Sequence, residues 1–262
     1  MSIVVASATG AVAGLIVSSW QGFKDPPWEG FFVGRFLRSI VVGAAAGGLI
    51  ALAAARGVLE IDNLGVLAFA VVAAERVVGE AYKGFFRPGA HAEYSKLLAR
   101  FGVRQSARLI KFLLGIAFIA VAYCLFWLLA LALERMASGG GPLALAGLVG
   151  GLGAGLLAAI GGALKDSQFE GFLPLKFIRS PIVAGLLGML LIHFSTSWFL
   201  VAMAMLGGER VGVECYKTFL KRQIRGIHAG KPVCHPWWYA HRGMFAASYG
   251  VAVAICLALL LT

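Results

Sequence analysis

The sequence predicts an all-α polytopic membrane protein with eight transmembrane helices, arranged as two parallel four-helix repeats. One reason is composition, because the 262 residues have a mean hydropathy of +0.86 and only 13% are charged. Another is the presence of apolar runs near the ~20 residues that span the hydrocarbon core of a bilayer. The third is a charged motif that occurs twice. These observations argue against a soluble enzyme.

Eight apolar runs approach the length of a membrane-spanning helix. They cover residues 2–20, 36–55, 64–85, 109–133, 142–164, 177–194, 197–217 and 243–262. The first run lacks the basic start of a secretory signal, and its Gly10 recurs as Gly151, so we interpret it as a retained helix. Arg179 and Pro181 interrupt the sixth run, for which a re-entrant hairpin is the alternative.

Lysine and arginine concentrate on one side of this arrangement. All but four of the 23 lie in the links after the first, third, fifth and seventh runs, or at the helix ends beside them. By the positive-inside rule these links face the cytoplasm and both termini lie outside. The net charge of +11 then reflects orientation in a prokaryotic cytoplasmic membrane. We expect no nucleic-acid partner, because the bases form no continuous face.

Two charged motifs define the repeat. "KDPPWEGFFVGRFLRS" (24–39) shares eight of its 16 positions with "KDSQFEGFLPLKFIRS" (165–180), and "ERVVGEAYKGFFR" (75–87) resembles "ERVGVECYKTFLK" (209–221). The repeats are expected to cover residues 1–140 and 141–262. Because each holds an even number of helices, the two copies enter the membrane in the same sense.

The motifs contain eight of the 12 acidic residues in the chain. Ionisable groups inside a membrane are costly, so their recurrence in both copies predicts a substrate- or ion-binding site. The candidate residues are Lys24, Asp25, Glu29, Arg38, Glu75, Arg76, Glu80, Tyr82, Lys83, Lys165, Asp166, Glu170, Arg179, Glu209, Arg210, Glu214, Tyr216 and Lys217. No catalytic residue and no cofactor can be assigned from these motifs, and no metal site is expected.

Helical spacing predicts where the acids lie. Glu75 is eleven residues beyond Leu64, which places it roughly 16 Å along a helix and near the middle of the membrane. Arg76, Glu80, Lys83 and Arg87 form one stripe that can pair internally, and Arg210, Glu214, Lys217 and Lys221 form the corresponding stripe. Glu75 has no base facing it on its own helix. We therefore expect Arg38 to pair with Glu75, and Arg179 with Glu209.

The start of the first motif has a simpler alternative interpretation. Asp25 precedes two prolines, which is typical of a helix N-cap, and Asp166 before Ser167 fits a cap as well. In this interpretation the two aspartates begin helices instead of binding a ligand.

The last basic link contains His228, Cys234, His235 and His241. Their spacing fits no common zinc pattern, and the adjacent Trp237–Tyr239 segment is typical of an interfacial aromatic belt. The four cysteines include no CxxC pair and predict no disulfide framework.

Three classes of function fit these features. The first is a transporter, flippase or channel-like protein that handles an anionic or lipid-phosphate substrate or a coupling ion, with carboxylates such as Glu75 and Glu209 carrying protons or cations. The second is a membrane-embedded enzyme acting on a phosphorylated lipid at the cytoplasmic surface. The third is a scaffold with a buried salt-bridge network. We favour the first, with the lipid bilayer and an anionic lipid or phosphate-bearing ligand as partners; the oligomeric state is not indicated.

Overall fold

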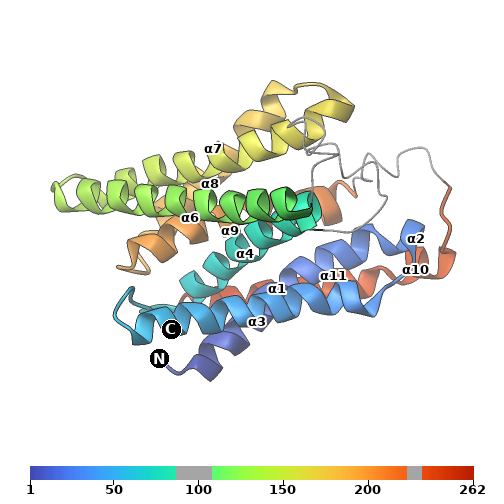
Figure 1. The fold of residues 1–262 in the computed structure, drawn as a ribbon, viewed down its shortest axis with the longest axis horizontal. Coiled ribbons are helices and arrows are strands. Elements are labelled where there is room, and N and C mark those ends of the chain that lie inside the picture. The colour runs from blue at the N-terminus through green and yellow to red at the C-terminus, as the bar shows by residue number, and fades with distance from the viewer. Residues whose placement is uncertain (87–107, 223–231) are drawn as a thin grey trace.

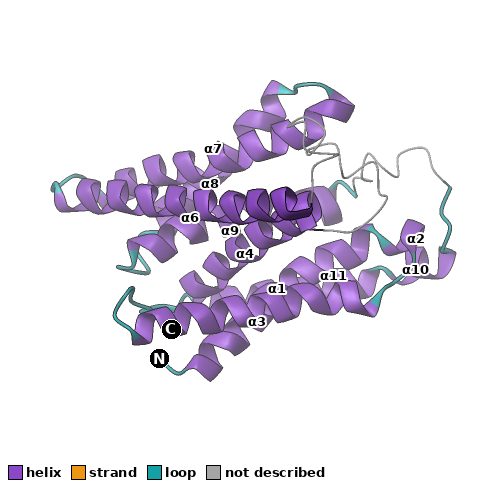
Figure 2. Ribbon diagram, in the orientation of Figure 1, coloured by secondary structure: helices purple, strands orange, loops and turns teal. Residues whose placement is uncertain are grey.

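The computed structural model describes residues 1–86, 108–222 and 232–262, and these residues fold into helices joined by short links (Figure 2). The side chains of Lys83, Arg108 and residues 164–170 lie outside the described set, as do all of 87–107 and 223–231. The long helices are α1 (Ile3–Lys24), α3 (Val33–Ala55), α4 (Leu64–Ala81), α6 (Arg108–Ser138), α7 (Leu143–Glu170), α8 (Pro174–Leu191), α9 (Trp198–Cys215) and α11 (Gly243–Ala258). The short elements are α2 (Pro26–Glu29), α10 (Pro236–His241) and the π-helical turns η1 (Tyr82–Phe86) and η2 (Tyr216–Leu220). No strand occurs in the described ranges, in agreement with the all-α prediction.

Six helical segments are long and apolar enough to cross a membrane. They are α1, α3, α6, α7, α8 and the continuous stretch Pro236–Ala258. A helix also occupies each of the other two expected segments, but α4 and α9 carry three ionisable residues each. The sixth expected segment is one continuous helix, α8, with Pro181 inside it, and not a hairpin. The fold is therefore that of a membrane protein with six candidate spans.

The two polar helices lie at the centre of the molecule (Figure 1). α4 packs against α9, with α1, α3 and α11 on one side of the pair and α6, α7 and α8 on the other. The backbones of α4 and α9 touch, because a Cβ atom added at Gly207 would lie 1.8 Å from the carbonyl oxygen of Phe69. Both helices are buried over most of their length, so their ionisable residues face protein.

Small residues bring the helices on each side into close contact. A Cβ atom at Gly10 of α1 would lie 2.2 Å from the carbonyl oxygen of Gly43 on α3. A Cβ atom at Gly151 of α7 would lie 2.1 Å from the carbonyl oxygen of Ala184 on α8. Packing of this kind is typical of membrane helices, which associate through van der Waals contact and not through the hydrophobic effect.

Several helices extend further into the charged motifs than the sequence predicted. α1 continues to Lys24, α7 continues to Glu170, and α8 begins at Pro174. A hydropathy window ends at the first charged residues, whereas backbone hydrogen bonding continues past them. The motif end of α1 lies near α2 and α10, the motif ends of α7 and α8 lie toward the same end of the molecule, and both chain termini lie away from it (Figure 1).

Candidate functional site

Glu75 is buried in the interior of α4, as its position in the sequence predicted. Only 2% of its surface is exposed. The hydroxyl of Ser39 on α3 donates a hydrogen bond of 2.6 Å to Oε1 of Glu75. Oε2 has no hydrogen-bond partner among the described residues. Glu75 is therefore a buried carboxyl group that is only half satisfied.

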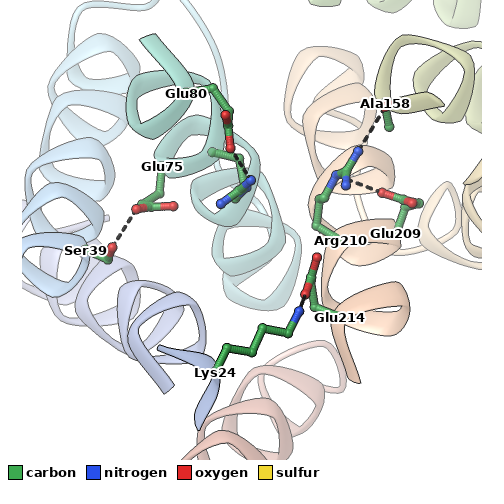
Figure 3. Close-up of polar contacts among 9 residues, drawn as sticks. Lys24, Ser39, Glu75, Glu80, Ala158, Glu209, Arg210 and Glu214 are labelled. Carbon is green, nitrogen blue, oxygen red and sulfur yellow. Dashed lines mark hydrogen bonds and ion pairs between the residues drawn. The ribbon is translucent and has the colours of Figure 1, made fainter. Parts of the chain in front are cut away.

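Glu209 occupies the corresponding place on α9 and is fully buried, with 0% exposure. Nε of Arg210 lies 3.2 Å from Oε2, close enough for an ion pair, yet neither oxygen has a well-aligned hydrogen bond within the described part of the chain. Nη2 of Arg210 instead donates to the carbonyl oxygen of Ala158 on α7 at 3.1 Å. Figure 3 shows Glu75 beside Ser39 and Glu209 beside Arg210, on the two sides of the central helices. The two carboxyl groups thus occupy separate sites.

The expected pairs between Arg38 and Glu75, and between Arg179 and Glu209, are not formed. The guanidinium of Arg38 lies over the ring of Tyr82, 5.4 Å from its centroid. Nε of Arg179 is buried without a hydrogen-bond partner in the described ranges. Ser39, the next residue on α3, donates the hydrogen bond to Glu75 instead. The partner from α3 is therefore one residue away from the predicted Arg38.

The two ionic stripes also differ from each other. Arg76 and Glu80 form the expected i,i+4 ion pair. Glu214, the counterpart of Glu80, pairs instead with Lys24 at the end of α1, and it accepts a longer hydrogen bond from Thr218. The predicted Arg210–Glu214 contact is thus replaced by a link between the two sides of the molecule (Figure 3). Lys83 lies outside the described side chains.

The motif that begins at Lys24 is largely used to turn the chain. Asp25 stands at the N-cap of α2 ahead of Pro26, as predicted, although its side chain makes no capping hydrogen bond. Glu29 pairs with Arg35 across the turn between α2 and α3. Asp166 is no cap, because α7 continues through it to Glu170.

A feature that the sequence analysis missed is the π-helical turn at the end of each polar helix. η1 begins at Tyr82 and η2 begins at Tyr216, the two tyrosines shared by the motifs. A cationic side chain lies over each ring: Arg38 over Tyr82, and Lys221 over Tyr216. Insertions of this kind recur at functional sites and re-aim the side chains that follow. No hydropathy signal marks such a turn.

A cavity of about 60 Å³ lies on the α7–α8 side of the molecule. Its polar lining combines three elements: Lys176, Arg179 and Ser180 from α8, Arg210 from α9, and Lys217 from η2. The remaining lining is Ala158, Ala159, Gly162, Ala163, Gly171, Phe172, Leu173 and Phe177. Arg179, Arg210 and Lys217 were candidates from the sequence, whereas Lys176 was not. The side chains of Lys165, Asp166 and Glu170 are outside the described set.

The cysteines and histidines of the last link gather no metal site in the part of the chain that is described. The backbone amides of Cys234 and His235 both donate to the carbonyl oxygen of Pro27, which fixes this link against α2. His241 stacks on Trp237, with ring centroids 4.3 Å apart. His228 lies outside the described residues.

Comparison with known proteins gives no relative: no family model, no curated protein and no solved structure matches the chain. The functional argument therefore depends on the geometry of the chain itself.

Proposed function

We propose that this chain is an integral membrane transport protein, in the class of transporters, flippases and channel-like proteins. Its architecture would be two parallel four-helix repeats, covering residues 1–140 and 141–262, with α4 and α9 as two further spans and both termini outside. Matched packing supports the repeats, since Gly10 against Gly43 in one half corresponds to Gly151 against Ala184 in the other. The basic links would face the cytoplasm of a prokaryotic cell.

One observation carries the transport proposal. Each of the two central helices holds a fully buried glutamate with an oxygen that no described residue hydrogen-bonds. An unsatisfied buried carboxyl group is costly in protein and more so at membrane depth. A group retained in that state in both halves is suited to take up and release a proton or to exchange partners with a passing ion.

A scaffold would need satisfied pairs instead. The pairs Lys24–Glu214, Arg76–Glu80 and Arg35–Glu29 are of that kind, and we assign them to structure. Glu75 and Glu209 are not, because Ser39 satisfies only one oxygen of the first and Arg210 only approaches the second.

The test is proton flux in liposomes that contain the purified protein and a trapped pH dye. A potassium gradient with valinomycin supplies the driving potential. We expect Glu75→Gln and Glu209→Gln each to slow proton entry by roughly tenfold or more, since each removes a group that carries charge at membrane depth. Glu134→Gln, an exposed acid on α6 outside both motifs, is the matched control and should transport like the wild type.

The reasoning is wrong if both glutamine variants and their double variant fold normally and conduct protons at the wild-type rate. Activity that survives only in the Glu75→Gln protein would instead assign transport to the α7–α9 side.

A further inference from the structure

The cavity on the α7–α8 side has the charge of an anion site. Four cationic side chains line it: Lys176, Arg179, Arg210 and Lys217. Lys217 has no carboxylate within ion-pair distance in the described ranges, and Nε of Arg179 is buried without a hydrogen-bond partner. Arg210 lies beside Glu209 and donates a hydrogen bond to the carbonyl oxygen of Ala158. Among the described residues, Arg179 and Lys217 therefore leave positive charge beside this space that no ion pair neutralises.

In the other half of the molecule, the matching cations whose side chains are described each have a partner. The two copies of the motif are offset by 141 residues, the separation of Lys24 and Lys165. Lys176 and Arg179 therefore correspond to Arg35 and Arg38. Arg35 pairs with Glu29, and Arg38 lies over the Tyr82 ring.

The third matching cation, Arg76, also has partners. It pairs with Glu80, and its guanidinium lies beside the ring of Trp20. Its counterpart in the second half is Arg210. Arg35 and Arg76 are thus ion-paired in the first half, and Arg38 lies over a ring. In the second half, Nε of Arg179 has no partner among the described residues.

Aromatic rings fill the matching space in the first half. A Cβ atom at Gly22, the counterpart of the cavity residue Ala163, would lie 2.6 Å from the ring of Phe245. The ring centroids of Phe31 and Phe36 lie 5.6 and 5.9 Å from that of Phe245. Phe172, the counterpart of Phe31, is 60% exposed beside the open cavity. Among the described residues, the second half therefore has a cavity beside its cations where the first half has packed rings.

We propose that this cavity binds a phosphate group, carried by a membrane lipid or by a free phosphate anion, and that Glu209 competes with it for Arg210. Arginine and lysine together match the several acceptor oxygens and the double charge of such a group. The volume would hold roughly four water molecules, which is close to the size of a phosphate group.

The position of the cavity fits a lipid as the carrier of the phosphate. Leu173 and Phe172 are exposed apolar residues at its edge, where an acyl chain can lie. The cytoplasmic placement of the site rests on the orientation in the proposed function, but binding of the anion does not.

The test uses the full chain in two arms. In phosphatidylcholine nanodiscs, inorganic phosphate is titrated by calorimetry; in detergent, retention of phosphatidic acid is measured by native mass spectrometry against phosphatidylcholine. Arg179→Gln and Lys217→Gln should each weaken binding by roughly tenfold or more, because each removes a charged hydrogen-bond donor. Arg38→Gln, the first-half counterpart of the Arg179 variant, should leave binding unchanged.

Glu209→Gln gives a change of opposite sign. It removes the negative charge beside Arg210, so phosphate binding should tighten by several-fold. A purely structural role for Glu209 would not tighten it. Lys217 lies in the short turn η2 and not in one of the long helices, so its variant remains informative even if Arg179→Gln fails to fold.

Binding in either arm with this pattern of variants supports the proposal, and the arm that binds identifies the source of the phosphate. The proposal is overturned if neither probe binds the wild type, if Arg38→Gln weakens binding as much as Arg179→Gln, or if Glu209→Gln weakens it. Proton flux without phosphate binding would leave the proposed function standing and remove this inference. Phosphate binding without proton flux would support this inference and contradict the proposed function.

Discussion

The hydrogen bond between Ser39 and Glu75 offers a direct measurement of how the buried carboxyl group is held. Ser39 is fully buried and Glu75 nearly so, and the donor and acceptor atoms are 2.6 Å apart. Ser39→Ala removes one hydroxyl and no other polar group. Glu75 would then have neither oxygen bonded by a described residue, because Oε2 already has no partner.

Two scales bracket the expected loss of unfolding free energy. Hydrogen bonds to charged groups contribute about 1.5–3 kcal/mol in soluble proteins. Polar contacts between membrane helices average about 0.6 kcal/mol, because the unfolded helices in the membrane also find partners. Since the structure provides no alternative donor for Glu75 within the described residues, we expect about 1–2 kcal/mol, between these scales.

The assay is a double-mutant cycle of Ser39→Ala with Glu75→Gln, using reversible unfolding in mixed micelles. The control is Ser19→Ala, which removes an equally buried hydroxyl whose partner is the neutral hydroxyl of Ser248, 2.9 Å away. Ser39→Ala should cost more than Ser19→Ala, and the cycle should give a coupling energy of about 1 kcal/mol or more. A coupling energy within error of zero would refute the pairing, and equal costs for the two serines would show that the bond to Glu75 contributes no more than one between two hydroxyl groups.

Two other predictions concern the ends of the molecule. In a cysteine-free background, cysteines at residues 92 and 230, which lie outside the described ranges, should be labelled only from the cytoplasmic side, and a cysteine at residue 139 only from outside; the reverse pattern would invert the orientation. At Asp62, burial alone would raise the pKa, but hydrogen bonds from Ser195 and Thr196 outweigh it and hold the pKa below its usual value. The stabilisation is therefore present above the unfolded pKa of about 4 and lost as the pH falls through the lower, folded value. Thermal unfolding should show Asp62→Asn less stable than the wild type at pH 7, with the difference vanishing in strong acid; a constant difference would contradict it.

The helices were predictable because their signal is local. An apolar run of sufficient length requires a helix in a membrane, where every backbone group must be bonded internally. The burial of Glu75 and Glu209 followed from the same register. The ends of the helices were less predictable, since α7 continues past the end of its apolar run at Leu164 to Glu170. The π-helical turns at Tyr82 and Tyr216 depend on packing that no residue pattern records.

The partners of the charges could not be predicted, because they depend on how the helices pack. Helical spacing favours Arg210 with Glu214, yet Lys24, distant in sequence, is the residue that reaches Glu214. The cavity could not be predicted from the sequence for a similar reason. Phe31 and Phe172 are the same residue type in the same motif, and only the rings of Trp238 and Phe245 beside Phe31 decide which half is filled.

The packing of the two remaining long helices explains how equal motifs came to differ. α11, in the second half of the sequence, packs most closely against α1, whereas α6, in the first half, packs against α9 and α7 (Figure 1). Each half of the sequence thus supplies the covering helix of the other side. α11 brings Phe245 to the first-half site, where it lies against Phe31 and Phe36. If the halves are repeats, as we propose, the exchange let each site change through residues outside its own motif. Rings could then fill the space beside Arg38 while the space beside Arg179 stayed open, with neither motif losing its charged residues.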